Sequence, residues 1–236
     1  IDGANDLLVK IYPGTFSQVL EGLDGIFQMP FGCFEQTSSA TYPNILVLDY
    51  MRRTKQIKPD IEMKALNYIN VGYQRLLSYE VKGGGFDWFG RPPAHTVLTA
   101  YGLMEFTDMA KVYDIDRAVI TRTRNWLYSQ QRPDGAWAPT EGGSHAEGAR
   151  KMLEGQMLRT TAYIAWAMAE SGESDSRTQR ALEYILKNAR SEDDTYTVAL
   201  CANAMIAADR PEAKRFLDQL DKDKKVDGEL VHWTSS

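Results

Sequence analysis

The run Gly83-Gly84-Gly85-Phe86-Asp87-Trp88-Phe89-Gly90 decides the fold, because it interrupts a long helical pattern with a glycine turn followed by aromatic residues. Similar turn-aromatic segments occur at 135–137 and 228–233. The three segments lie about one and then two periods apart, with a period of roughly 45 to 50 residues. The spacing therefore indicates an internal repeat.

Apolar residues at helical spacing fill the stretches between these turns and group into pairs of helices. The positions from Ile45 to Met51 and from Ile61 to Leu77 predict one pair, separated by Lys58-Pro59-Asp60. Asp114 or Asp116 is available to cap the second helix of the next pair. A short helix is predicted at 15–27, and the remaining pairs are predicted at 94–112 with 115–131, 146–171 with 175–189, and 194–208 with 211–221.

Each predicted unit is a helical hairpin with one apolar face, and hairpins of this kind bury that face by stacking side by side. The closed form of such a stack is a toroid with an inner and an outer ring of helices. The sequence thus predicts an all-α fold, an (α/α) toroid over residues 14–236. Four pairs are readable, so we expect a truncated ring with an exposed apolar edge. Residues 1–13 are predicted to contribute a linking strand, at 7–12, to an adjacent β domain.

Composition excludes several classes of partner. With a net charge of -5 and scattered Lys and Arg, the 236-residue chain has no basic stripe that would hold nucleic acid or anionic lipid. No apolar run approaches the roughly 20 residues that cross a bilayer, which argues against direct membrane insertion. Two cysteines do not make a disulfide framework. Because the first residue is not Met, we expect a fragment of a larger protein.

The stretch Met29-Pro30-Phe31-Gly32-Cys33-Phe34-Glu35-Gln36 places a thiol three residues before a carboxamide. Such a thiol can displace ammonia from the glutamine side chain and leave an activated acyl group, an internal thioester. The pattern Gly-Cys-x-Glu-Gln would arise by chance in on the order of one in two thousand chains of this composition. A buried, inert cysteine is the alternative, and it leaves Gly32, Glu35 and Gln36 unexplained.

The segment 28–36 resembles the thioester motif of the alpha-2-macroglobulin and complement family. Further segments resemble that family's thioester domain at its spacing and in its order, so that the resemblance runs from about position 8 to the end of the chain; they are 43–50, 68–75, 98–101 and 133–135. The resemblance implies a toroid of six helix pairs, a CUB-like neighbouring domain and an intramolecular Cys33-Gln36 cross-link in place of any cofactor. Residues 35–43 look more like bacterial members than vertebrate ones.

Within the motif, the resemblance makes Cys33 the nucleophile and Gln36 the acyl donor. Gly32 lets the backbone approach closely or adopt a positive φ beside the ring, and Glu35 orients the segment or caps a helix. Three apolar residues are candidates for shielding the bond from water, although ordinary core packing explains them equally well: Met29, Phe31 and Phe34.

His145, ten residues after Gly135, is the third candidate catalytic residue. In complement components a histidine stands at a corresponding distance after a Pro-Asp-Gly turn, and the resemblance implies that it attacks the thioester and favours hydroxyl acceptors. The loop 138–155 departs most from the family in length, so the alternative is a solvent-exposed loop histidine.

The other histidines and the second cysteine are expected to have structural roles. His95 and His232 lie at repeat turns and are expected to cap or pack, and Cys201 lies on an apolar helical face. The sequence alone leaves a Cys33–Cys201 disulfide possible, and such a bond would prevent the thioester from forming. No pattern of metal ligands is present in the sequence, and Gly83–Gly85 lacks the Lys-Ser/Thr of a phosphate-binding loop.

The leading hypothesis is a thioester domain of a bacterial-type alpha-2-macroglobulin, periplasmic or secreted, belonging to a larger peptidase inhibitor. It would acylate attacking proteases or nearby surface hydroxyls and amines once, and so would not be an enzyme. One alternative is a toroid enzyme of the terpenoid-cyclase or prenyltransferase type, whose nearest acidic cluster is Glu192-Asp193-Asp194. Another is a non-covalent interaction scaffold.

Overall fold

The computed structural model describes residues 27–55, 57–139, 157–172, 175–191 and 194–234. Two short antiparallel hairpins pair β1 (Glu80–Val81) with β2 (Gly85–Phe86) and β3 (Lys225–Asp227) with β4 (Leu230–His232). The rest of the regular structure over these ranges is helical: α2 (Phe34–Arg53), α3 (Pro59–Leu77), α4 (Thr96–Val112), α5 (Ala118–Ser129), α7 (Met157–Glu170), α8 (Ser176–Asn188), α9 (Thr195–Ala207) and α10 (Ala213–Asp223).

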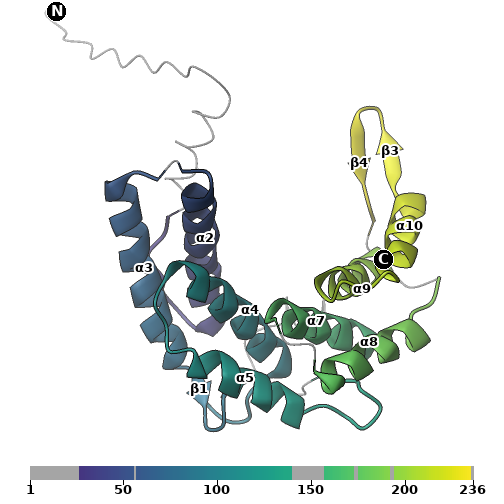
Figure 1. Ribbon diagram of the computed structural model, residues 1–236, viewed down its shortest axis with the longest axis horizontal. Helices are drawn as coiled ribbons and strands as arrows, with labels where there is room; N and C mark the ends of the chain where they lie inside the picture. The colour runs from purple at the N-terminus through teal and green to yellow at the C-terminus, as the bar shows by residue number, and fades with distance from the viewer. Residues whose placement is uncertain (1–26, 56, 140–156, 173–174, 192–193, 235–236) are drawn as a thin grey trace, which may run out of the picture.

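The helices form two layers. The first helices of successive pairs, α2, α4, α7 and α9, each pack on the next, and each also packs on the second helix of its own hairpin. Figure 1 shows the pairs following one another round an open arc, with α3, α5 and α8 on its outer side. The prediction of an all-α toroid of helical hairpins is confirmed.

The paired helices lie close to their predicted positions, but α2 begins well before the apolar pattern that predicted it. The polar residues Thr37, Ser38 and Thr41 are completely buried in its first half, so hydrophobic periodicity gives no signal there. Thr41 packs so closely on α3 that a Cβ at Gly72 would lie 2.1 Å from its hydroxyl oxygen. The predicted linking strand at 7–12 and most of the predicted helix 15–27 fall outside the described residues.

The turn-aromatic repeat is visible in matching contacts. The backbone N–H of Phe86 donates to the Thr99 hydroxyl at 2.8 Å, and one repeat later the N–H of Trp137 donates to the Thr161 hydroxyl at 3.0 Å. Both aromatic side chains are fully buried. Each turn therefore pins its aromatic residue to the first helix of the following pair.

The turn glycines repeat in the same way. A Cβ at Gly84 would lie 2.5 Å from the carbonyl oxygen of Arg122, and a Cβ at Gly135 would lie 2.5 Å from that of Arg180. Both glycines also have positive φ, so the turn and the close approach to an outer helix each require glycine.

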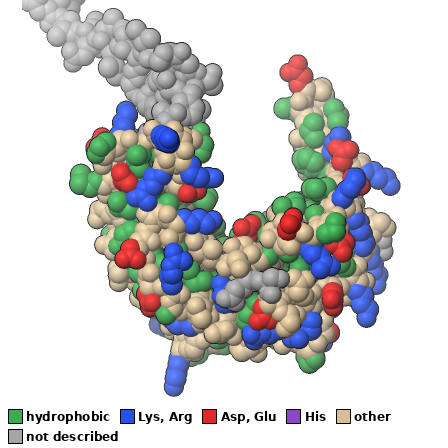
Figure 2. All heavy atoms as spheres, in the orientation of Figure 1, with side chains coloured by type: hydrophobic (Ala, Val, Ile, Leu, Met, Phe, Trp, Pro, Cys, Tyr) green, Lys and Arg blue, Asp and Glu red, His purple; other side chains and the backbone are tan. Residues whose placement is uncertain are grey.

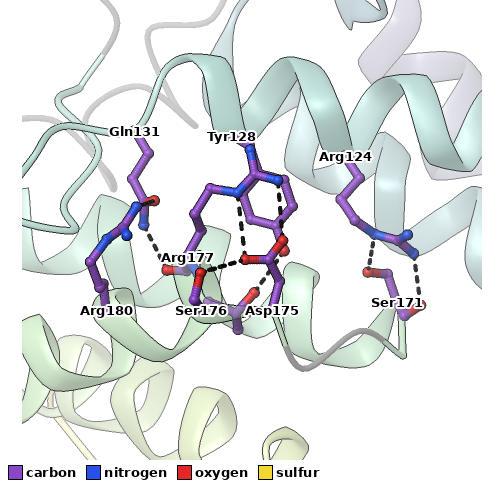
Figure 3. Close-up of polar contacts among 9 residues, drawn as sticks. Arg124, Tyr128, Gln131, Ser171, Asp175, Ser176, Arg177 and Arg180 are labelled. Atoms are coloured by element: carbon purple, nitrogen blue, oxygen red, sulfur yellow. Dashed lines mark hydrogen bonds and ion pairs between the residues drawn. The ribbon is translucent and has the colours of Figure 1, made fainter.

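Polar contacts join the outer helices α5 and α8 (Figure 3). The Arg177 guanidinium lies 3.8 Å from the centre of the Tyr128 ring, and Asp175 holds that guanidinium at 3.1 Å. Arg124 donates to the hydroxyl and the carbonyl oxygen of Ser171 at 3.1 and 2.9 Å. These contacts link the second hairpin to the third on the outer side of the arc.

The surface carries acidic and basic side chains interspersed along both arms of the arc on the face shown in Figure 2. No described helix has the length and apolar character needed to span a bilayer. Large exposed apolar side chains occur at several places on the described surface, and five of them lie on α9, α10 and the β3–β4 hairpin: Ile206, Leu217, Val226, Leu230 and Val231.

Candidate functional site

The candidate site is the N-terminus of α2. Gly32 has φ of +79°, Cys33 is extended at the N-cap, and the helix begins at Phe34. The Phe34 ring is fully buried and lies 5.2 Å from the ring of Phe86, while its backbone N–H donates to the carbonyl oxygen of Trp88 at 3.0 Å. The first turn-aromatic segment thus anchors the helix that carries the motif.

Cys33 and Gln36 face each other in a reciprocal arrangement. The Gln36 side-chain oxygen accepts a hydrogen bond from the Cys33 backbone N–H at 3.1 Å, and the Cys33 side chain faces the Gln36 backbone N–H. This is the pattern of a capping box, with sulfur in the place of the usual hydroxyl. It folds the Gln36 carboxamide back to the Cys33 backbone, so that the thiol and the carboxamide both lie at the N-terminus of α2.

The Gln36 carboxamide packs directly against the backbone of Gly32. A Cβ on Gly32 would lie 2.0 Å from the Gln36 side-chain oxygen and 2.8 Å from its carboxamide carbon. No real side chain fits there, and the positive φ also favours glycine. Gly32 thus shows both features expected of it, the close approach of the backbone and the positive φ.

Glu35 is held by the turn-aromatic segment. The Trp88 indole N–H donates to the Glu35 carboxylate at 3.3 Å, and the Trp88 ring lies 4.7 Å from that of His95. His95 in turn caps α4 through a contact of 3.5 Å with the backbone N–H of Leu98, as expected of a capping histidine. Glu35 therefore ties the start of α2 to the start of α4.

An open pocket of about 600 Å³ lies over the pair. Of the three candidate shielding residues, Phe31 lines this pocket and is exposed, Met29 is exposed, and Phe34 points into the core. Core packing, the alternative explanation, accounts for Phe34. The pocket is lined by Gln28, Phe31, Cys33, Glu35, Gln36, Ser39, Ala40 and Phe89.

Comparison with known proteins agrees with this geometry. The sequence model of a protein family, the A-macroglobulin TED domain, matches residues 8–236 of the chain. The chain belongs to this family. Ovostatin of Gallus gallus is 36% identical over 235 residues, a match that covers 97% of this chain and 16% of ovostatin's length. The resemblance inferred from the motif and its flanking segments is confirmed.

The remaining reactive groups of this TED domain have structural surroundings. No disulfide joins Cys33 to Cys201, and Cys201 is buried in the α9 core. The Asp194 carboxylate accepts from Arg159 at 2.6 Å, and it caps α9 by accepting from the backbone N–H of Thr197 at 3.1 Å. Across the described ranges, no group of three or more His, Cys, Asp or Glu is arranged to hold a metal ion.

His145 lies outside the described residues, as does the loop around it, so its position relative to Cys33 stays a prediction. His232 is in β4 and is exposed, so the described structure does not show the capping or packing role expected of it.

Two site residues of the TED domain escaped sequence reasoning. The Arg75 Nη2 donates to the Gly32 carbonyl oxygen at 2.8 Å, and the Tyr79 hydroxyl donates to the same oxygen at 2.5 Å. The predicted helical hairpin could have pointed to these two residues. Because α2 and α3 are antiparallel neighbours, the end of α3 must lie beside the start of α2.

Proposed function

We propose that this TED domain forms an internal thioester between the Cys33 sulfur and the Gln36 side-chain carbon. The observation that carries the proposal is the reciprocal Cys33–Gln36 contact above Gly32, where only glycine leaves room for the carboxamide. Family membership supports it independently.

The reaction is an acyl transfer. The sulfur adds to the Gln36 carboxamide carbon, the carbon–nitrogen bond breaks, and ammonia leaves with the proton of the thiol. An acceptor hydroxyl, amine or water later attacks the same carbon, and its proton ends on the released Cys33 thiol. The domain is consumed in that second step, so it acts once and does not turn over.

The acceptor enters through the pocket over the pair. Its volume of about 600 Å³ admits a small hydroxyl or amine compound, or the side chain of a protein surface. In the full-length protein, neighbouring domains would cover the pair until an attacking protease cleaves the molecule. We place the parent protein outside the cytoplasm, as a periplasmic or secreted peptidase inhibitor of the bacterial type that forms covalent bonds with proteases or nearby surfaces.

In this proposal, His145 determines which acceptor receives the acyl group, and it favours hydroxyls over amines. A neutral imidazole that attacks the thioester would form an acyl-imidazole and free the Cys33 thiolate, which then serves as base for a hydroxyl. The placement of His145 after the Pro133-Asp134-Gly135 turn supports this assignment.

The alternatives have less support. A toroid enzyme of the terpenoid-cyclase type needs a metal–diphosphate site, whereas the Asp194 carboxylate is engaged by Arg159 and Thr197. A non-covalent scaffold would use the same fold without the bond, and the experiment below separates the two.

The test is incorporation of labelled methylamine at neutral pH. We expect one label per chain, located at Gln36 by peptide mass spectrometry, with release of one titratable thiol at Cys33. Cys201→Ala serves as the matched control and should incorporate label normally, while Cys33→Ala should incorporate none. Label spread over other residues, or equal labelling of Cys33→Ala, would overturn the proposal.

A further inference from the structure

The Gly32 carbonyl oxygen receives two donors from the end of α3. Arg75 and Tyr79 both donate to it, and the same Arg75 nitrogen lies 3.1 Å from the Tyr79 hydroxyl, so the three groups form a closed triangle. Arg75 and Tyr79 are one helical turn apart, which puts both on the face that meets the motif. We call this contact the Gly32 clamp.

The Arg75 charge is directed at the clamp. Among the described residues, Arg75 makes no ion pair with a carboxylate, and its Nε is buried without a hydrogen-bond partner. A guanidinium in a protein is always charged and is ordinarily paired with an acid when partly buried. Here a backbone carbonyl is its acceptor, so the positive charge acts on the Gly32–Cys33 peptide.

That peptide is the one that holds the Gln36 carboxamide. Its carbonyl lies in the clamp, and its N–H, on Cys33, donates to the Gln36 side-chain oxygen at 3.1 Å. A charge-assisted bond to a carbonyl polarises the peptide unit and strengthens the N–H on its far side. Clamp, peptide and carboxamide therefore form one continuous chain of hydrogen bonds.

Negative charge develops on that side-chain oxygen whenever the Gln36 carbon becomes tetrahedral, both when sulfur attacks and when an acceptor attacks. A fixed backbone N–H aimed at such an oxygen stabilises the charge, as in an oxyanion hole. The positive end of the α2 dipole acts in the same direction.

We propose that Arg75 and Tyr79 are positioning residues of the thioester chemistry: through the Gly32 carbonyl they fix and polarise the Cys33 N–H that holds the Gln36 oxygen. The role in acyl transfer rests on the proposed function; the effect on the Cys33 N–H does not.

The variants are Tyr79→Phe, which keeps the ring that packs 6.3 Å from Phe34, and Arg75→Gln, which removes the charge and keeps most of the stem. Arg75→Lys keeps the charge and should restore part of the effect. Arg52→Gln is the control, because Arg52 also donates to a backbone carbonyl, that of Val112 at 2.7 Å, away from the motif. Its loss also breaks an ion pair with Glu62, so it perturbs the fold at least as much as Arg75→Gln does.

The first measurement follows ammonia release while chain that was isolated unfolded, with the Gln36 carboxamide still intact, folds for the first time; helix content and thermal midpoint are recorded for each variant. We expect Arg75→Gln and Tyr79→Phe to form the bond about tenfold more slowly, a smaller effect than the removal of a whole oxyanion donor. Arg52→Gln should form it at the wild-type rate. Equal rates in all variants, or an equal loss in Arg52→Gln, would overturn the proposal.

The second measurement does not need the thioester. The chain has two cysteines, so selective ¹⁵N-cysteine labelling gives two amide signals, from Cys33 and Cys201. In samples treated with methylamine and kept reduced, so that Cys33 is a free thiol in every protein, the clamp variants should move the Cys33 signal and leave Cys201 in place as an internal reference. If wild type releases no ammonia, the proposed function fails, and a Cys33 signal unmoved by Arg75→Gln and Tyr79→Phe overturns the clamp separately.

Discussion

Glu105 gives the most quantitative prediction of the structure, because it is a fully buried acid in α4, beside the helix that begins at the motif. Neither carboxylate oxygen makes a hydrogen bond within the described part of the chain. Burial raises its pKa from 4.5 to about 8, and the nearby Ser38 hydroxyl, although it is not in good hydrogen-bond geometry, opposes the rise. Burial therefore favours the neutral form of Glu105 near pH 7.

The groups facing Glu105 do not supply a counter-charge. They are tyrosines from three helices, Tyr42 in α2, Tyr101 in α4 and Tyr163 in α7. Burial is the largest cause of the raised pKa of each, and the charge of Glu105 raises each pKa further. Ionised Glu105 would thus face rings that stay neutral.

The sign of the pH dependence follows from linkage. Below pH 4.5 the acid is protonated in both the folded and the unfolded chain, so it contributes no pH dependence. Between pH 4.5 and about 8 the unfolded chain has lost the proton and the folded chain keeps it, so stability falls as pH rises. A full proton corresponds to about 1.4 kcal/mol per pH unit, and the total is on the order of a few kcal/mol.

The assay is urea unfolding of wild type and Glu105→Gln between pH 5 and 8. Glutamine has nearly the same shape and does not ionise, so all other titrating groups cancel in the difference between the two proteins. We expect Glu105→Gln to gain a few kcal/mol of unfolding free energy relative to wild type from pH 5 to pH 8. Parallel pH profiles would refute the reasoning that Glu105 stays protonated in the folded state.

Three further predictions concern the motif, the core and the acceptor. Gly32→Ala should cost about 1 to 2 kcal/mol through its positive φ and should abolish methylamine labelling at Gln36, and normal labelling would contradict the close approach. Asp194→Asn breaks a buried ion pair with Arg159 and should destabilise the fold by about 3 to 5 kcal/mol in urea unfolding, whereas a loss below about 1 kcal/mol would show that the pair is not structural. His145→Asn should lower the rate with glycerol relative to methylamine by about a hundredfold or more, and an unchanged ratio would remove His145 from the reaction.

Most of the architecture could be predicted from the sequence, because apolar periodicity and glycine-aromatic turns are local signals. The pairs at 94–112 with 115–131 and 194–208 with 211–221 lie within a few residues of α4, α5, α9 and α10. The repeat also predicted that the turn aromatics belong to equivalent positions, and Phe86 and Trp137 make equivalent contacts.

The first half of α2 could not be predicted in this way. Its inward-facing residues include Thr37, Ser38 and Thr41, which are buried but polar, and a hydrophobic pattern does not register them. Such residues allow close helix packing, as at Gly72, and they leave the helix start to be found from the motif alone.

The motif predicted the Cys33–Gln36 pair, since a thiol and a carboxamide three residues apart are a local feature. The Gly32 clamp is not local. Arg75 and Tyr79 are more than 40 positions from Gly32 along the chain. Their part in the site follows only from the antiparallel packing of α2 and α3.

The most direct test of the central claim is the intact mass of the freshly purified wild-type chain beside that of Cys33→Ala. An internal thioester requires the wild type to be lighter than its sequence by one molecule of ammonia, and the variant to have its full sequence mass. Full sequence mass in both proteins would contradict the account.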